Sequence, residues 1–109
     1  MSTADSIKEI TDAIKDLLLY KNKKYGDSAL NPINIFYQGN RSDSLMIRLD
    51  DKISRIKNRK DYSPETNDIC DIIGYCVLLL INKCVTAEEI NKLKDWLWEL
   101  LPDLKIMKR

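Results

Sequence analysis

Apolar residues recur at spacings of three and four along most of this chain, and this feature restricts its fold more than any other. The first such stripe consists of Ile7, Ile10, Ile14, Leu17 and Leu18. These spacings place side chains on one face of an α-helix, and no segment shows the strict alternation of a half-buried strand. The chain has only 3 Gly and 3 Pro, so breaks between helices are few. The pattern predicts an all-α fold.

Capping and break signals divide this pattern into four helices. The predicted ranges are 3–24, 42–60, 63–83 and 86–101. Ser6 and Glu9 form a capping-box pattern near the first start, and Thr86 and Glu89 form another at the fourth. Ser63, as N-cap before Pro64, marks the third. Gly26 ends the first helix. The third helix is apolar almost all round, so we expect it at the centre.

The length fits one four-helix bundle-like domain over residues 1–109, with a long loop, residues 27–41, between the first two helices. The apolar run Val77–Ile81 is far shorter than the roughly 20 residues of a membrane span, and no signal peptide is visible. Three cysteines without CxxC spacing form no disulfide framework and are interpreted as buried, reduced thiols. These features predict a cytoplasmic protein with no membrane partner.

The chain contains no histidine, which excludes Ser–His–Asp and Cys–His triads and zinc bound by histidine. Catalysis, if there is any, has to use carboxylates, lysine, tyrosine or a hard metal ion. The 18 basic and 17 acidic residues give a formal charge of +1, which argues against nucleic acid as a partner.

The third predicted helix carries acids on one face. Asp68, Asp71 and Tyr75 lie within about 60° of one another on a helical wheel, and Glu65 lies one turn earlier. Carboxylates on an otherwise apolar helix are costly unless a positive charge compensates them. A Mg²⁺ ion with oxygen ligands is one solution, and cations from another helix are the other.

The second predicted helix supplies such cations. Arg48, Lys52 and Arg55 share one face beside the apolar stripe, with Asp51 just beyond them. Packing fixes the stems of such side chains, so their charges can meet either a carboxylate or a phosphate. Two interpretations stay open. One is an ion-pair seam that joins Arg48 or Arg55 to Asp68 or Asp71, and the other is a phosphate or metal site.

A third element follows the first helix, in the run Lys21–Asn22–Lys23–Lys24–Tyr25–Gly26. Lysines suit phosphate oxygens and Tyr25 can stack on a base, although a basic last turn before glycine is also ordinary helix capping. The ordered set K-N-x-x-Y-G, R-x-x-x-K-x-x-R and D-x-x-D, over about residues 10–82, resembles the phage and bacterial nucleotide modification associated domain 1 family.

That family is distantly similar to the MazG-like all-α nucleoside triphosphate pyrophosphohydrolases. The resemblance implies an oligomeric helical bundle that binds Mg²⁺ through an E-x-x-E pair on one helix and an E-x-x-D pair on the next. It also implies cleavage between the α and β phosphates. Asp68 and Asp71 match the second pair, with aspartate at its first position. The first pair has no counterpart, because Asp50 and Asp51 are adjacent and cations occupy the place of the second acid.

The resemblance therefore implies a phage-linked, nucleotide-handling protein, either a Mg²⁺-dependent pyrophosphohydrolase or a nucleotide-sequestering module of the counter-defence type. The candidate metal ligands are Asp51, Glu65, Asp68 and Asp71, of which Asp51, Asp68 and Asp71 are also the candidate catalytic carboxylates. The candidate nucleotide-binding residues are Lys21, Lys24, Tyr25, Arg48, Lys52, Arg55 and Tyr75. The pair Phe36–Tyr37 is a second candidate for stacking on the base.

The last segment favours another class, a structural protein that forms oligomers. Its apolar residues are Trp96, Leu97, Leu100, Leu101, Leu104 and Ile106. Exposed apolar patches of this kind usually mark interfaces, so we expect homo-oligomerisation through the helix at 86–101 and its tail. The alternative is packing of this segment within the monomer.

Overall fold

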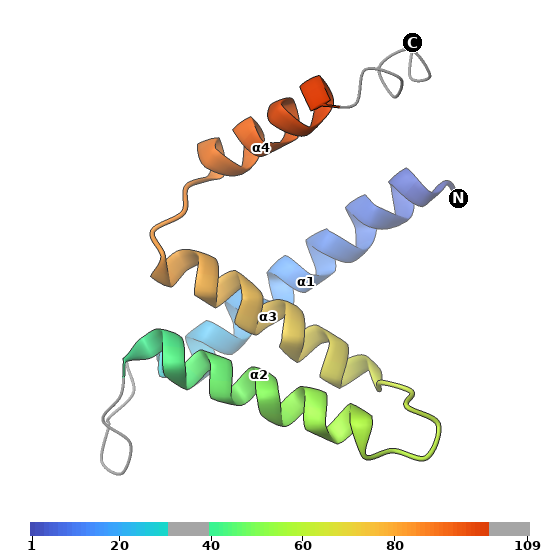
Figure 1. Ribbon diagram of the computed structural model, residues 1–109, viewed down its shortest axis with the longest axis vertical. Coiled ribbons are helices and arrows are strands. Elements are labelled where there is room, and N and C mark those ends of the chain that lie inside the picture. The colour runs from blue at the N-terminus through green and yellow to red at the C-terminus, as the bar shows by residue number, and fades with distance from the viewer. Residues whose placement is uncertain (31–39, 101–109) are drawn as a thin grey trace.

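A computed structural model describes residues 1–30 and 40–100, with side chains up to residue 98. It contains the helices α1 (Thr3–Tyr25), α2 (Arg41–Lys57), α3 (Thr66–Asn82) and α4 (Ala87–Leu100) (Figure 1). The described residues include no strand, which confirms the all-α fold. Most of the predicted long loop lies outside the described residues.

The ends of α1 follow capping chemistry, with one correction. Ser2 is the N-cap: its hydroxyl accepts a hydrogen bond from the Asp5 N–H, and the Asp5 carboxylate accepts one from the Ser2 N–H. The capping box therefore lies four residues before the predicted box at Ser6 and Glu9. Gly26 ends the helix in the left-handed conformation, at φ 61°, as its position predicts.

The turn between α2 and α3 is longer than predicted, because α2 ends at Lys57 and α3 begins only at Thr66. Ser63 does not cap α3. Its N–H donates to the Asp61 carboxylate and its carbonyl accepts from Arg59, so both backbone groups of Ser63 are used within the turn. Glu65 takes the N-cap position without a side-chain hydrogen bond.

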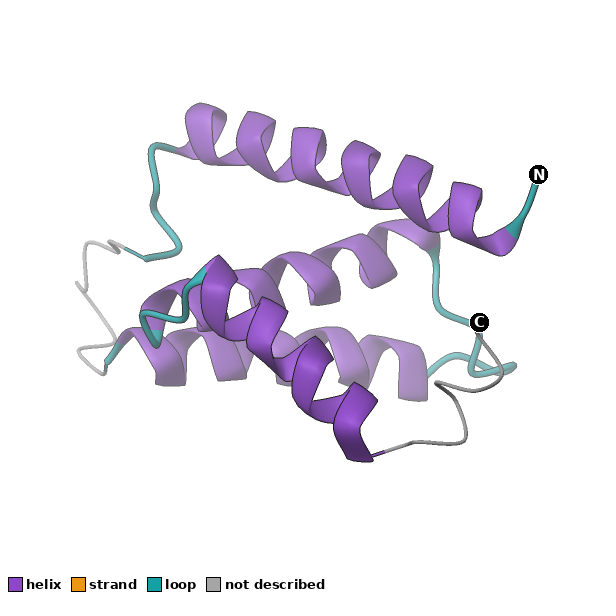
Figure 2. Ribbon diagram, turned by 90° about the horizontal axis from the view of Figure 1, so that it is seen from above, coloured by secondary structure: helices purple, strands orange, loops and turns teal. Residues whose placement is uncertain are grey.

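The central position of α3 is confirmed, since it packs against both α1 and α2. Helices α2 and α3 are antiparallel and lie side by side (Figures 1 and 2). Asn82 donates to Ser42 at 2.7 Å near one end of this pair. Leu45 is the one hydrophobic side chain among the described residues that is fully buried.

Helix α1 crosses α3 at Gly74, which is buried. A Cβ atom at this position would lie 2.9 Å from Cδ2 of Leu18, closer than real Cβ contacts. The absence of a side chain at Gly74 therefore lets the two helices approach closely. The same crossing brings the C-terminal turn of α1 beside the first turns of α3, where the polar side chains lie.

Helix α4 begins after Thr86, whose hydroxyl accepts a hydrogen bond from the Glu89 N–H at 3.2 Å, as its capping pattern predicts. It makes no contact with the other three helices, so one chain does not form the expected four-helix bundle within its described residues (Figure 1). Trp96 and Leu97 are exposed, whereas the other predicted apolar residues of this segment lie outside the described side chains.

No described helix by itself has the length and hydropathy to cross a membrane; α3 and most of α4 meet those criteria only as a pair bent by 105°. The three cysteines are free thiols. The prediction that they are buried is wrong for Cys76 and Cys84, which are exposed, and Cys70 is half-buried. Cys84 lies beyond the end of α3, in the left-handed region at φ 60°.

Candidate functional site

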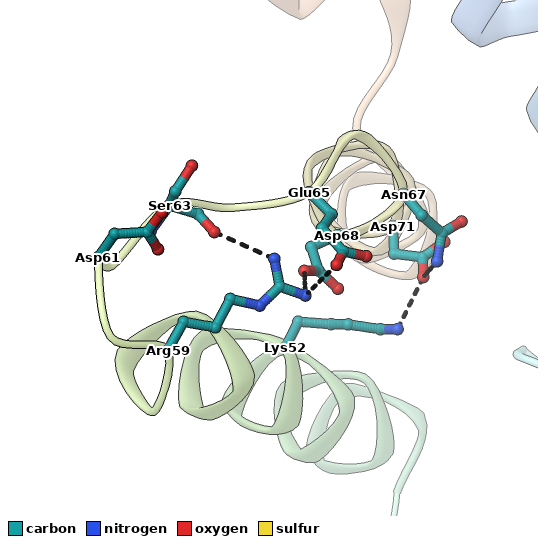
Figure 3. A network of polar contacts seen from close by, with 8 residues as sticks. All are labelled: Lys52, Arg59, Asp61, Ser63, Glu65, Asn67, Asp68 and Asp71. Carbon is teal, nitrogen blue, oxygen red and sulfur yellow. Dashed lines mark hydrogen bonds and ion pairs between the residues drawn. The ribbon is translucent and has the colours of Figure 1, made fainter.

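The best-defined polar site joins three helices at Asp71. The Lys52 ammonium lies 2.8 Å from Oδ2 of Asp71, and the Lys21 ammonium lies 2.9 Å from Oδ1. The Asp71 and Lys52 side chains are only 14% and 12% exposed, whereas Lys21 is 34% exposed. Figure 3 shows Lys52 reaching across from α2 to Asp71 on α3. The lysine-pair site consists of Lys21, Lys52 and Asp71.

Titration of this site reflects two opposing effects. Burial alone would raise the pKa of the Asp71 carboxyl, but hydrogen bonds from Lys52 and Lys21 outweigh it and hold the pKa below its usual 3.8. The hydrogen bond to Asp71 raises the pKa of Lys21 above its usual 10.5, against a smaller effect of burial. Both groups are therefore charged at neutral pH, and the site carries one net positive charge.

We expect the stability contributed by Asp71 to disappear in acid. Because its folded-state pKa lies below the unfolded value of 3.8, the unfolded chain takes up the proton first as the pH falls. The parent protein should exceed Asp71→Asn in stability by about 1–3 kcal/mol at neutral pH, and this difference should fall as the pH drops through the folded-state pKa. Urea unfolding of both proteins across the acid range measures it.

The stability contributed by Lys21 has the opposite pH dependence and is lost in alkali. The contribution of Lys21 to stability is complete below pH 10.5 and is lost as the pH rises through its raised, folded-state pKa.

A difference in stability between the parent and Asp71→Asn that stays constant from neutral to acid pH would contradict the assignment of the acid-side loss to Asp71.

A second cluster closes the turn between α2 and α3 around Arg59 (Figure 3). The Arg59 guanidinium lies 2.9 Å from Oδ2 of Asp68 and 3.2 Å from Oε1 of Glu65, and it donates to the Ser63 carbonyl at 3.0 Å. Asp68 is only 3% exposed. Its Oδ2 accepts no hydrogen bond despite the short distance, because the Arg59 N–H is not directed at that oxygen. Arg59, Ser63, Glu65 and Asp68 form the Arg59 cluster.

An ion-pair seam between α2 and α3 is therefore present, but with other cations than the sequence suggested. Lys52 and Arg59 make its ion pairs, whereas Arg48 and Arg55 pair with no acid in the described part of the chain. Sequence reasoning missed Arg59. It lies two residues beyond the end of α2, so the helical spacing that groups Arg48, Lys52 and Arg55 does not extend to it.

The remaining predicted site residues lie around these two clusters. Lys24 lies over the rings of Tyr20 and Tyr25, with its ammonium 6.0 and 5.6 Å from their centroids, and Tyr25 is 59% exposed. Tyr75 is half-buried and close enough to Lys21 to contribute to its raised pKa. Asp51 is exposed on α2. Phe36 and Tyr37 lie outside the described residues.

The acids predicted to hold Mg²⁺ do not fit a metal site as they are arranged. Asp68 faces Arg59, Asp71 is taken by two lysines, and Glu65 is 72% exposed at the start of α3. Within residues 1–30 and 40–98, no group of three or more Asp, Glu or Cys side chains comes close enough to hold a metal ion.

Comparison with protein-family models, curated proteins and solved structures gives no match for this chain. The resemblance of the three ordered motifs to nucleotide-handling proteins stays a prediction. A functional assignment has to come from the chemistry of the side chains at the lysine-pair site and around it.

Proposed function

We propose that this protein binds a nucleotide through its phosphates at the lysine-pair site. The supporting observation is the convergence of two ammonium groups, from α1 and α2, on one carboxylate at 2.8–2.9 Å. Lysines attract phosphate oxygens as point charges, and packing has already restricted these two side chains. Asp71 balances one of the two charges, so one positive charge is left to attract an anion.

The surroundings of the site suit the rest of a nucleotide. Tyr25 follows Lys21 by four residues and so lies on the same face of α1, where its exposed ring can stack on a base. Arg48 precedes Lys52 by four residues on α2 and pairs with no described acid, so it can neutralise a further phosphate. A ligand would reach the site from the side of Lys21, whose side chain is more exposed than that of Lys52.

Binding without hydrolysis is the form of this proposal that the geometry favours, because the acids do not gather into a metal site. The Mg²⁺-dependent pyrophosphohydrolase and the purely structural protein are then alternative outcomes of one experiment. The pure protein is titrated with a panel of nucleoside triphosphates and cyclic nucleotides, with and without Mg²⁺. Pyrophosphate release is followed, and the ligand is recovered after denaturation.

We expect a nucleotide to bind and to be recovered unaltered. Lys21→Gln should weaken that binding by about 10- to 100-fold, since a hydrogen bond to a charged group contributes about 1.5–3 kcal/mol. Isothermal titration calorimetry measures the change. Lys23→Gln is the matched control, because it removes the same charge from the opposite face of the same helical turn.

Three results would count against this proposal. Release of pyrophosphate in the presence of Mg²⁺ would show that the protein is a pyrophosphohydrolase and not a protein that only binds nucleotide. If no nucleotide of the panel binds, the lysine-pair site is only a structural ion-pair seam. Equal weakening by Lys23→Gln would mean that binding depends on the overall charge of this helix end and not on the lysine-pair site.

A further inference from the structure

Apolar stripes on two helices have no partner within the described part of the chain. On α1, Ile7 and Ile10 are 57% and 58% exposed. On α4, Ile90, Leu93 and Leu97 are between 44% and 51% exposed. Helix α4 and the N-terminal half of α1 both extend away from the α2–α3 pair (Figure 1), and α4 contacts no other helix.

The spacing of these residues fits packing against another helix. Ile7, Ile10 and Ile14 on α1 are separated by three and then four residues, and the stripe on α4 has the same spacing. Alternation of three and four is the pattern of a coiled-coil seam, in which each apolar side chain enters a hole on a facing helix. The two stripes therefore have matching periods.

The exposed surface of one chain is large enough to account for a stable dimer interface. The accessible surface is 9090 Å², whereas a compact monomer of 12.7 kDa should expose about 6,200 Å². The radius of gyration is 17.3 Å, against about 13 Å for a compact domain of this length. Obligate homodimers bury about 1,000–2,500 Å² per partner, which is within the excess.

We propose that a second copy of this chain covers these stripes. In this dimer, each chain contributes two elements to the interface, α4 and the N-terminal half of α1. They pack against the same two elements of the other chain, so that the two chains share one helical bundle. A second copy fits better than a single foreign helix, because two separate stripes of equal period need two helices. A two-fold axis supplies both at once. This interface is independent of the lysine-pair site.

The first test is the mass of the full-length protein in solution. Size-exclusion chromatography with light scattering should give twice the 12.7 kDa of one chain, and the thermal midpoint should rise with protein concentration. Ile10→Lys and Leu93→Lys should each weaken dimerisation at least tenfold. Asp16→Lys and Asp95→Lys are the matched controls, since each places a lysine on the opposite face of the same helix and should leave the dimer intact.

A second measurement needs no variant that has to fold. Isotopically heavy and light chains are mixed, unfolded and refolded together, and then treated with a lysine cross-linker. Cross-links between heavy and light chains should join Lys8 or Lys15 of α1 to Lys92 or Lys94 of α4. A monomer at all concentrations, controls that dissociate as readily as the stripe variants, or the absence of heavy–light links between α1 and α4 would each overturn the proposal.

Discussion

Replacing Arg59 with methionine is expected to destabilise the protein by about 3–5 kcal/mol, the usual loss when one partner of a buried ion pair is removed. Asp68 is 3% exposed, and the Arg59 guanidinium, at 2.9 Å, is its only counter-charge within the described part of the chain. Without that cation, the carboxylate is buried and unpaired. Urea unfolding followed by far-ultraviolet circular dichroism, at a fixed protein concentration, measures the change in the free energy of unfolding.

Arg55→Met is the matched control for this variant. Arg55 lies four residues earlier, is exposed, and pairs with no described acid, so the same substitution should change the free energy of unfolding by less than about 0.5 kcal/mol. The double variant Arg59→Met/Asp68→Leu should regain most of the loss, because it removes both charges together. A single variant Arg59→Met as stable as the parent would show that Asp68 does not depend on Arg59.

The helices could be predicted from the sequence because each depends on local signals. Apolar residues at spacings of three and four place all four, and Gly26 and Thr86 mark ends that the structure reproduces. The error at the start of α3 arises because the capping residue has another partner. Ser63 fits an N-cap by residue type, but the Arg59 cluster uses its carbonyl, and α3 begins three residues later.

The two ends of the polar seam differ in how far the sequence could predict them. Asp71 was expected to meet a cation of the second helix, but Arg48 or Arg55 was named for that role, and Lys52 of the same face fills it. Lys21 could not be placed, because its position depends on the crossing angle of α1 over α3, and Gly74 sets that close approach. Arg59 lies beyond the end of α2, where helical periodicity no longer applies.

The position of α4 was also beyond sequence reasoning. Periodicity shows that Ile90, Leu93 and Leu97 form an apolar face, and the structure leaves that face exposed. A helical wheel identifies which side of a helix needs to be covered, but it does not say whether the cover is the same chain or another. That choice depends on the length and direction of the link after α3, which periodicity does not report.

Leu45→Ala is expected to destabilise the protein by about 2–5 kcal/mol. Leu45 has no exposed surface and is the one hydrophobic side chain among the described residues that is fully buried, so the core of α2 against α3 depends on it more than on any other side chain. It also lies on the same face of α2 as Lys52, seven residues away. Loss of its packing should therefore loosen the helix that positions Lys52.

Met46→Ala is the matched control, because Met46 is the next residue of α2 and is 53% exposed. It should cost less than about 1 kcal/mol, since a half-exposed side chain leaves no cavity when it is shortened. Thermal unfolding of both variants at equal protein concentration makes the comparison. Equal losses for Leu45→Ala and Met46→Ala would contradict a core centred on Leu45 and would mean that the exposed face of α2 is itself covered in solution.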